Sequence, residues 1–144
     1  FSAADRPDEP SVTDNTPLVL GVRVAVSVDG ASLSAVRFFK AEGEASSGHV
    51  GRVYSYPDGQ LLASTGEVES DAACAGGSWV SLPLESPLSL HRGESYVLAV
   101  DAVTHYAKSA DFFSAAGPRA VSGVSAVGSA FGITTGAYPS MTLT

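Results

Sequence analysis

The segment from Leu18 to Val28 constrains the fold most, because apolar residues alternate with polar or small ones along almost its whole length. Side chains of an extended strand point to opposite faces in turn, so one face of this segment is continuously apolar. A sheet with one apolar face needs a second layer of structure to cover that face. The pattern therefore predicts a β-strand in a layered all-β domain.

Length and composition agree with this architecture. The chain has 144 residues, which suits a single domain, and only 16% of them are charged. Its 15 glycines and 8 prolines favour many turns over long helices. The formal charge of -7 argues against nucleic acid as a partner, because that affinity depends on clustered Lys and Arg. No apolar run approaches the roughly 20 residues of a membrane-spanning helix, so membrane insertion is not expected.

Turn signals divide the chain into short strands. Residues 1–17 carry three prolines and four acidic residues, and they are expected to form an extended N-terminal arm before a single β-sandwich domain over 18–144. Residues 42–48 form a predicted polar loop. The predicted strands cover 33–40, 50–56, 61–69, 79–84 and 95–103, with turns at Asp29-Gly30, Pro57-Asp58-Gly59 and Arg92-Gly93-Glu94.

Two of these strands carry information about their position in a sheet. Apolar side chains occupy both faces of 95–103, which indicates a central strand. Pro83 cannot donate a ladder hydrogen bond, so it places 79–84 at a sheet edge or ends the strand there. A short helix over 110–116 is the only one that the sequence supports. The predicted fold is an all-β, two-sheet antiparallel β-sandwich of jelly-roll or Greek-key type, with few or no helices.

Seven short motifs follow one another between residues 15 and 140. They are LGVRV at 20–24, VRFFK at 36–40, HVGRVY at 49–54, GQLLA at 59–63, Trp79, GESYV at 93–97, and His105-Tyr106 with FFS at 112–114. In this order they resemble an uncharacterised all-β domain family of secreted, wall-associated bacterial proteins. Members of that family occur beside immunoglobulin-like and carbohydrate-active modules. The resemblance implies an extracellular or cell-surface location.

The resemblance also bears on the end of the chain. Family members close with an aromatic-rich strand after a turn that Gly136-Ala137-Tyr138-Pro139-Ser140 resembles, and only residues 141–144 follow that turn here. The last strand is therefore expected to be short or missing. A missing strand would leave an open sheet edge, which a neighbouring protein chain could fill by strand addition.

No arrangement of residues in the sequence predicts catalysis. Serines and acids are common, but no Gly-x-Ser-x-Gly segment marks a nucleophile. Glu67 and Glu69 lie two residues apart on the same face of a predicted strand. The two catalytic carboxylates of a glycosidase instead face each other across a cleft. The histidines His49, His91 and His105 are scattered without the spacing of zinc ligands. The chain is therefore expected not to be an enzyme.

A structural calcium ion is the one cofactor that the sequence leaves open. Loop carboxylates and carbonyls are the usual calcium ligands, but no Asp-x-Asp-x-Asp loop is present to define a ligand set. Six aspartates occur mostly in predicted loops or at strand ends: Asp14, Asp29, Asp58, Asp71, Asp101 and Asp111.

Aromatic side chains favour a carbohydrate-binding role. Sugar rings present apolar C–H faces that stack on aromatic rings, while their hydroxyls need planar polar partners. The candidate ligand-binding residues are Tyr54, Tyr56, Trp79, His105, Tyr106 and Arg37.

These candidates are expected in different environments. A lone tryptophan in a β-sandwich is more often a core residue than a surface platform, so Trp79 favours the core. Tyr56 precedes a turn at a hairpin end, where side chains are often exposed. The family pattern implies that His105 and Tyr106 line a surface groove. Arg37 and Lys40 are expected to flank the same sheet face as this groove.

The sequence therefore predicts a non-catalytic extracellular module that binds polysaccharide or a cell-wall or matrix glycoprotein. The alternative is a structural or adhesive subunit of a filament or matrix, whose surface packs on neighbouring protein chains without recognising free sugar.

Overall fold

Residues 18–26 of the alternating segment form the second half of the longest strand in the computed structural model, whereas Val28 lies beyond the strand and is exposed. The structure describes residues 6–44, 48–66, 77–108, 119–121, 123–132 and 140–142. Within these ranges the chain forms nine β-strands and no helix. The strands are β1 (Glu9–Val26), β2 (Ala31–Lys40), β3 (Gly51–Tyr56), β4 (Leu61–Ser64), β5 (Ser78–Leu90), β6 (Ser95–Lys108), β7 (Arg119–Val121), β8 (Val124–Gly132) and β9 (Ser140–Thr142).

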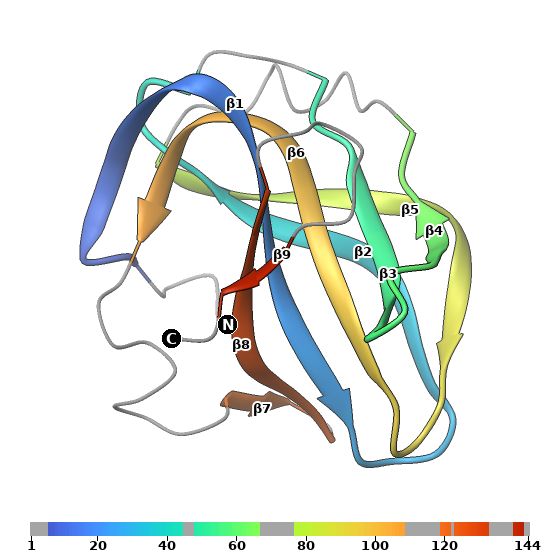
Figure 1. Ribbon diagram of the computed structural model, residues 1–144. Helices are drawn as coiled ribbons and strands as arrows, with labels where there is room; N and C mark the ends of the chain where they lie inside the picture. The colour runs from blue at the N-terminus through green and yellow to red at the C-terminus, as the bar shows by residue number, and fades with distance from the viewer. Residues whose placement is uncertain are drawn as a thin grey trace.

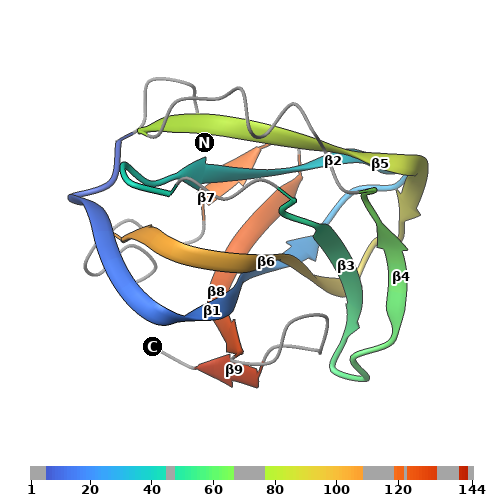
Figure 2. The same ribbon diagram turned by 90° about the horizontal axis from the view of Figure 1, so that it is seen from above.

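The strands form two antiparallel sheets (Figure 1). The large sheet has the order β4-β3-β6-β1-β8-β7, with β9 added to β8, and the small sheet consists of β2 and β5. Figure 2 shows β2 and β5 as a separate layer that crosses one face of the large sheet. The fold is therefore the predicted two-sheet all-β sandwich.

The pairing of the first six strands is nested. β1 pairs with β6, β2 with β5 and β3 with β4, all antiparallel. These strands thus resemble one long hairpin whose turn connects β3 to β4. The hairpin is folded so that its β2–β5 pair lies in the small sheet and the other two pairs lie in the large sheet. Such winding defines a jelly roll, one of the two topologies that the sequence leaves open.

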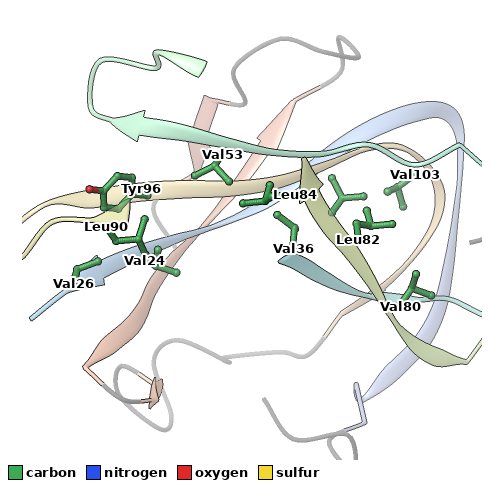
Figure 3. Packing of buried hydrophobic residues seen from close by; sticks show 11 residues of the cluster. Val24, Val26, Val36, Val53, Val80, Leu82, Leu84, Leu90, Tyr96 and Val103 are labelled. Carbon is green, nitrogen blue, oxygen red and sulfur yellow. The ribbon is translucent and has the colours of Figure 1, made fainter. Parts of the chain in front are cut away.

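The main core lies between the two sheets (Figure 3). Val24 and Val26 of β1 belong to it, and Leu20 and Val22 pack against it, which confirms the apolar face predicted for the alternating segment. Leu82 of β5 is fully buried, with 0% of its surface exposed. Burial of a side chain of this size contributes about 1.5–3 kcal/mol relative to leaving it in water. The two layers are held together mainly by this apolar contact.

The large sheet also buries residues on its other face. Val19, Tyr54, Val97 and Ala99 form a second cluster there, and each is at most 3% exposed. β6 supplies side chains to both clusters and pairs with β1 on one side and β3 on the other. The prediction of a central strand over 95–103 is therefore confirmed.

The N-terminal segment differs from the expected arm. Residues 9–17 belong to β1, because Glu9, Val12 and Thr13 lie opposite residues near the end of β6. Register shifts interrupt this pairing between Glu9 and Leu18. Such bulges explain why the segment lacks the regular alternation from which a strand could have been predicted.

β5 extends further than predicted. It continues through Pro83 to Leu90, and Pro83 lies opposite Ala35 of β2. β2 and β5 form a sheet of only two strands, so each has one outer edge where a missing N–H breaks no ladder hydrogen bond. The edge position indicated by Pro83 is confirmed, whereas the predicted strand end at residue 84 is wrong.

The final strand is present and short. Residues Ser140–Thr142 form β9, which pairs with β8. The strand predicted over 61–69 corresponds to β4, which ends at Ser64, and residues 67–69 lie outside the described residues. The predicted helix over 110–116 also lies outside them.

Candidate functional site

The structure divides the six candidate residues among three places. The pairs are Arg37 and Trp79 on the small sheet, Tyr54 and Tyr56 on β3, and His105 and Tyr106 on β6.

The outer face of the small sheet gathers Arg37, Phe39 and Trp79. Their chain neighbours Phe38 and Val80 pack in the core between the sheets, so strand alternation directs the three side chains away from that core. Phe39 of β2 and Trp79 of β5 are direct cross-strand partners. Trp79 is therefore half-buried on an outer face and does not belong to the core, contrary to the environment that the sequence favours.

The rings on this face contact each other and two guanidinium groups. The Phe39 and Trp79 ring centroids lie 5.6 Å apart with an interplanar angle of 84°, an edge-to-face arrangement. The guanidinium carbon of Arg37 lies 5.6 Å from the Trp79 ring centroid. That of Arg6 lies 5.8 Å from the Phe39 ring centroid. We call Arg6, Arg37, Phe39 and Trp79 the Trp79 face.

Lys40 does not share this face with Arg37. It is only 2% exposed, whereas Arg37 is exposed. Residues three positions apart on a strand point to opposite faces, so the expectation that both flank one face is wrong. Phe39 was not predicted as a site residue. Its position two residues after Arg37 on the same strand would have placed both side chains on one face.

Tyr56 lines a separate hollow at one end of the large sheet. The ring of Tyr56 also contacts Arg23, whose guanidinium carbon lies 4.8 Å from the ring centroid. The carboxylate of Glu94 accepts a hydrogen bond of 2.7 Å from the hydroxyl of Tyr96. The hollow measures about 320 Å³ and is lined by Ser55, Tyr56, Asp58, Gly93, Glu94 and Ser95. It shares no residue with the Trp79 face.

Tyr54 is not presented at the surface. It is 3% exposed and belongs to the cluster on the outer side of the large sheet. Burial raises the pKa of its phenol above 10.0, and the nearby charge of Arg52 opposes this shift. Arg52 itself pairs with the buried carboxylate of Asp101.

His105 and Tyr106 lie near the end of β6 but face different surroundings. Tyr106 is partly buried against the main core, so its ring supports packing. The side chain of His105 is 28% exposed, and its Nδ1 lies 3.9 Å from Oε2 of Glu44. No surface groove formed by the two side chains together follows from this arrangement.

Glu44 is a buried acidic residue that the sequence analysis did not single out. It comes from the predicted polar loop, where glutamates are usually solvated, yet its side chain is 0% exposed. Oε2 accepts hydrogen bonds from Thr104 N and Oγ1 at 2.8 Å and from His105 N at 2.6 Å. These donors compensate for the cost of burying a carboxylate. The contacts fasten the loop to β6 and leave the carboxylate no access to solvent.

The aspartates considered for calcium are distributed over the fold. Asp29 lies 3.5 Å from Arg92, and Oδ1 of Asp14 accepts a hydrogen bond of 3.1 Å from Thr16 N. In the described part of the chain, no three His, Cys, Asp or Glu side chains are grouped so as to hold a metal ion. Asp71 and Asp111 lie outside that part. A structural calcium ion stays a prediction.

The fold and this surface define a β-sandwich module with an aromatic outer face. The chain belongs to the family described as "Domain of unknown function (DUF4082)", whose model matches residues 4–144. This agrees with the predicted resemblance to an uncharacterised domain family, while secretion and neighbouring modules remain predictions. Neither the curated proteins nor the solved structures gave a match to the chain. Among the residues that the structure describes, no helix is long and apolar enough to cross a membrane.

Proposed function

We propose that this domain is a non-catalytic binding module that attaches to polysaccharide through the Trp79 face. One observation carries the proposal: Phe39 and Trp79 lie side by side on an outer sheet face, with the guanidinium of Arg37 against the indole. The main core is built mostly from valine and leucine and does not contain the indole. The largest aromatic side chain of the chain thus lies where it can meet a partner.

The chemistry of this face suits a sugar polymer. The C–H faces of sugar rings stack on aromatic rings, and the N–H groups of a guanidinium donate hydrogen bonds to sugar hydroxyls. Ser81 lies opposite Arg37 on the neighbouring strand and is exposed, so it adds a hydroxyl to the same face. Arg37 and Trp79, two of the predicted ligand-binding residues, therefore act together.

The rigid setting favours binding. Both rings are attached to paired strands, which hold their spacing before a ligand arrives and lower the entropy lost on binding. A sheet face is also extended, so it can contact successive sugar units of one polymer. Because such polymers are abundant in cell walls and matrices, the proposal includes an extracellular or cell-surface location.

Pull-down on insoluble polysaccharides and affinity electrophoresis in soluble ones test the proposal. Trp79→Ala should abolish retention, while Tyr56→Ala, an aromatic variant in the separate hollow, should retain it. Circular dichroism and thermal unfolding would confirm that both variants are folded. Retention that is lost in Tyr56→Ala but kept in Trp79→Ala would contradict the assignment to this face. Release of soluble sugar by the pure protein would contradict a non-catalytic role.

The same experiments address the structural or adhesive alternative. A subunit of that kind should self-associate with increasing concentration in analytical ultracentrifugation and should bind none of the polysaccharides. That combination of results would overturn the proposal of a polysaccharide-binding module.

A further inference from the structure

Arg37 is an exposed cation that contacts an aromatic ring. Its side chain is exposed on β2 and lies against the indole of Trp79. No carboxylate of the described residues forms an ion pair with its guanidinium. The aromatic ring holds the cation in place while leaving its charge without an anionic partner from these residues.

Three other cations lie beside carboxylates. Arg52 pairs with Asp101, and Arg92 lies 3.5 Å from Asp29. Lys108 lies 3.4 Å from Glu9. The sequence holds 15 acidic residues against 8 Lys and Arg, so carboxylates are plentiful. The contact of Arg37 with a ring is therefore not explained by a shortage of acids. Arg23 also contacts a ring, that of Tyr56, but Arg23 is half-buried, whereas Arg37 is exposed.

We infer that the polysaccharide bound at the Trp79 face is anionic and that Arg37 binds a carboxylate of its sugar units. This inference rests on the proposed function and names the substrate class. A uronic acid unit combines the two groups that the face matches, because its ring has an apolar C–H face and its edge carries a carboxylate. The planar guanidinium fork bonds such a carboxylate through two parallel N–H donors.

The charge distribution favours binding of an anionic polysaccharide at the Trp79 face. Arg6 brings a second guanidinium to the face, where it lies over the Phe39 ring. The chain as a whole carries a formal charge of -7, so its net charge opposes the binding of a polyanion. Within the described ranges, Arg6 and Arg37 offset this repulsion locally at the Trp79 face. Binding should weaken as salt is added, because exposed charges are screened.

Matched polymers isolate the carboxylate. Polygalacturonate, alginate and hyaluronate are compared with their methyl esters, which keep the sugar rings and lose the charge. We expect the wild-type protein to bind at least one acid form at least tenfold more tightly than its ester in isothermal titration calorimetry. Loss of a charge-assisted hydrogen bond predicts that Arg37→Gln weakens binding of the acid form about 10- to 100-fold. Arg37→Lys should give an intermediate affinity, because it keeps the charge without the fork.

Arg92→Gln provides the matched control, since Arg92 is exposed and pairs with Asp29 away from this face. It should bind as the wild type does. Equal affinity for acid and ester forms, or an Arg37→Gln variant that binds the acid form normally, would overturn the inference. Trp79-dependent binding to neutral polysaccharides alone would also overturn it and would leave the proposed function standing. Absence of binding to any polysaccharide would overturn both.

Discussion

The carboxylate of Glu44 lies 3.7 Å from Nε2 of His49, and the side chains of both residues are fully buried. The imidazole of His49 also packs against Phe38, with 5.0 Å between the ring centroids. This pair joins the loop between β2 and β3 to the core. Oε2 of the same carboxylate reaches the backbone of β6 at Thr104 and His105.

We expect Glu44→Ala to lower the free energy of unfolding by about 3 kcal/mol, because it leaves three part-buried donors of β6 without their acceptor. Urea denaturation followed by circular dichroism measures this change. Glu42→Ala is the matched control, since Glu42 belongs to the same loop and is exposed. Equal losses in the two variants would show that the hydrogen bonds of Glu44 do not contribute to stability.

Gly21 should not tolerate a side chain. A Cβ atom placed there would lie 2.8 Å from the carbonyl oxygen of Leu98 on the neighbouring strand. Backbone atoms of a paired strand cannot move aside freely, so Gly21→Ala should destabilise the fold by about 1–3 kcal/mol. Gly66→Ala is the control, because no atom lies within 4 Å of the added Cβ. Thermal unfolding should show a lower Tm for Gly21→Ala alone.

Stability should fall at alkaline pH, in part because of Tyr54. Burial raises the pKa of this tyrosine above 10.0 in the folded state. The phenol ionises near pH 10 in the unfolded chain, so above that pH the unfolded state loses a proton that the folded state keeps. This contribution to stability is complete below pH 10 and is lost as pH rises toward the folded pKa. Burial raises the pKa of Tyr96 in the same direction.

The variant Tyr54→Phe should lose less stability than the wild type between about pH 9 and about pH 11, since phenylalanine has no proton to lose. Urea denaturation at the two pH values gives the comparison. An identical loss in both proteins would mean that ionisation of Tyr54 does not contribute to alkaline destabilisation.

Trp79 is the only tryptophan in the chain, so intrinsic fluorescence reports on the Trp79 face. Because the indole is half-buried on an outer face, acrylamide should quench its emission in the folded protein. A bound polysaccharide should reduce this quenching by covering the ring. Emission that acrylamide does not quench would show that the indole is inaccessible before any ligand binds.

The strands and their faces could be predicted where period-two alternation is regular. Leu20 and Val24 show this, because their positions alone place them on the apolar face. Alternation also explains the error at Lys40, since its spacing from Arg37 already assigns the two residues to opposite faces. Residues 9–17 could not be predicted as strand, because bulges disturb their pairing with β6.

The candidate site was predicted only in part. The types of Arg37 and Trp79 marked them as binding residues, but their contact depends on the pairing of β2 with β5, which are separated by two strands in the sequence. The burial of Glu44 likewise depends on donors from β6, some 60 residues further along the chain. Contacts between residues so far apart in the sequence produce no local sequence pattern from which they could be predicted.

The nested pairing has a consequence for how the chain can assemble. If β3 and β4 join first, β2 and β5 are brought near each other, and their union in turn brings β1 to β6. Each step then closes only a short gap, so the entropy lost in joining distant segments is divided into small increments. Cutting the chain at the β3–β4 turn and linking residue 144 to residue 1 would remove this sequence of short closures while leaving the strand pairs of the sandwich unchanged.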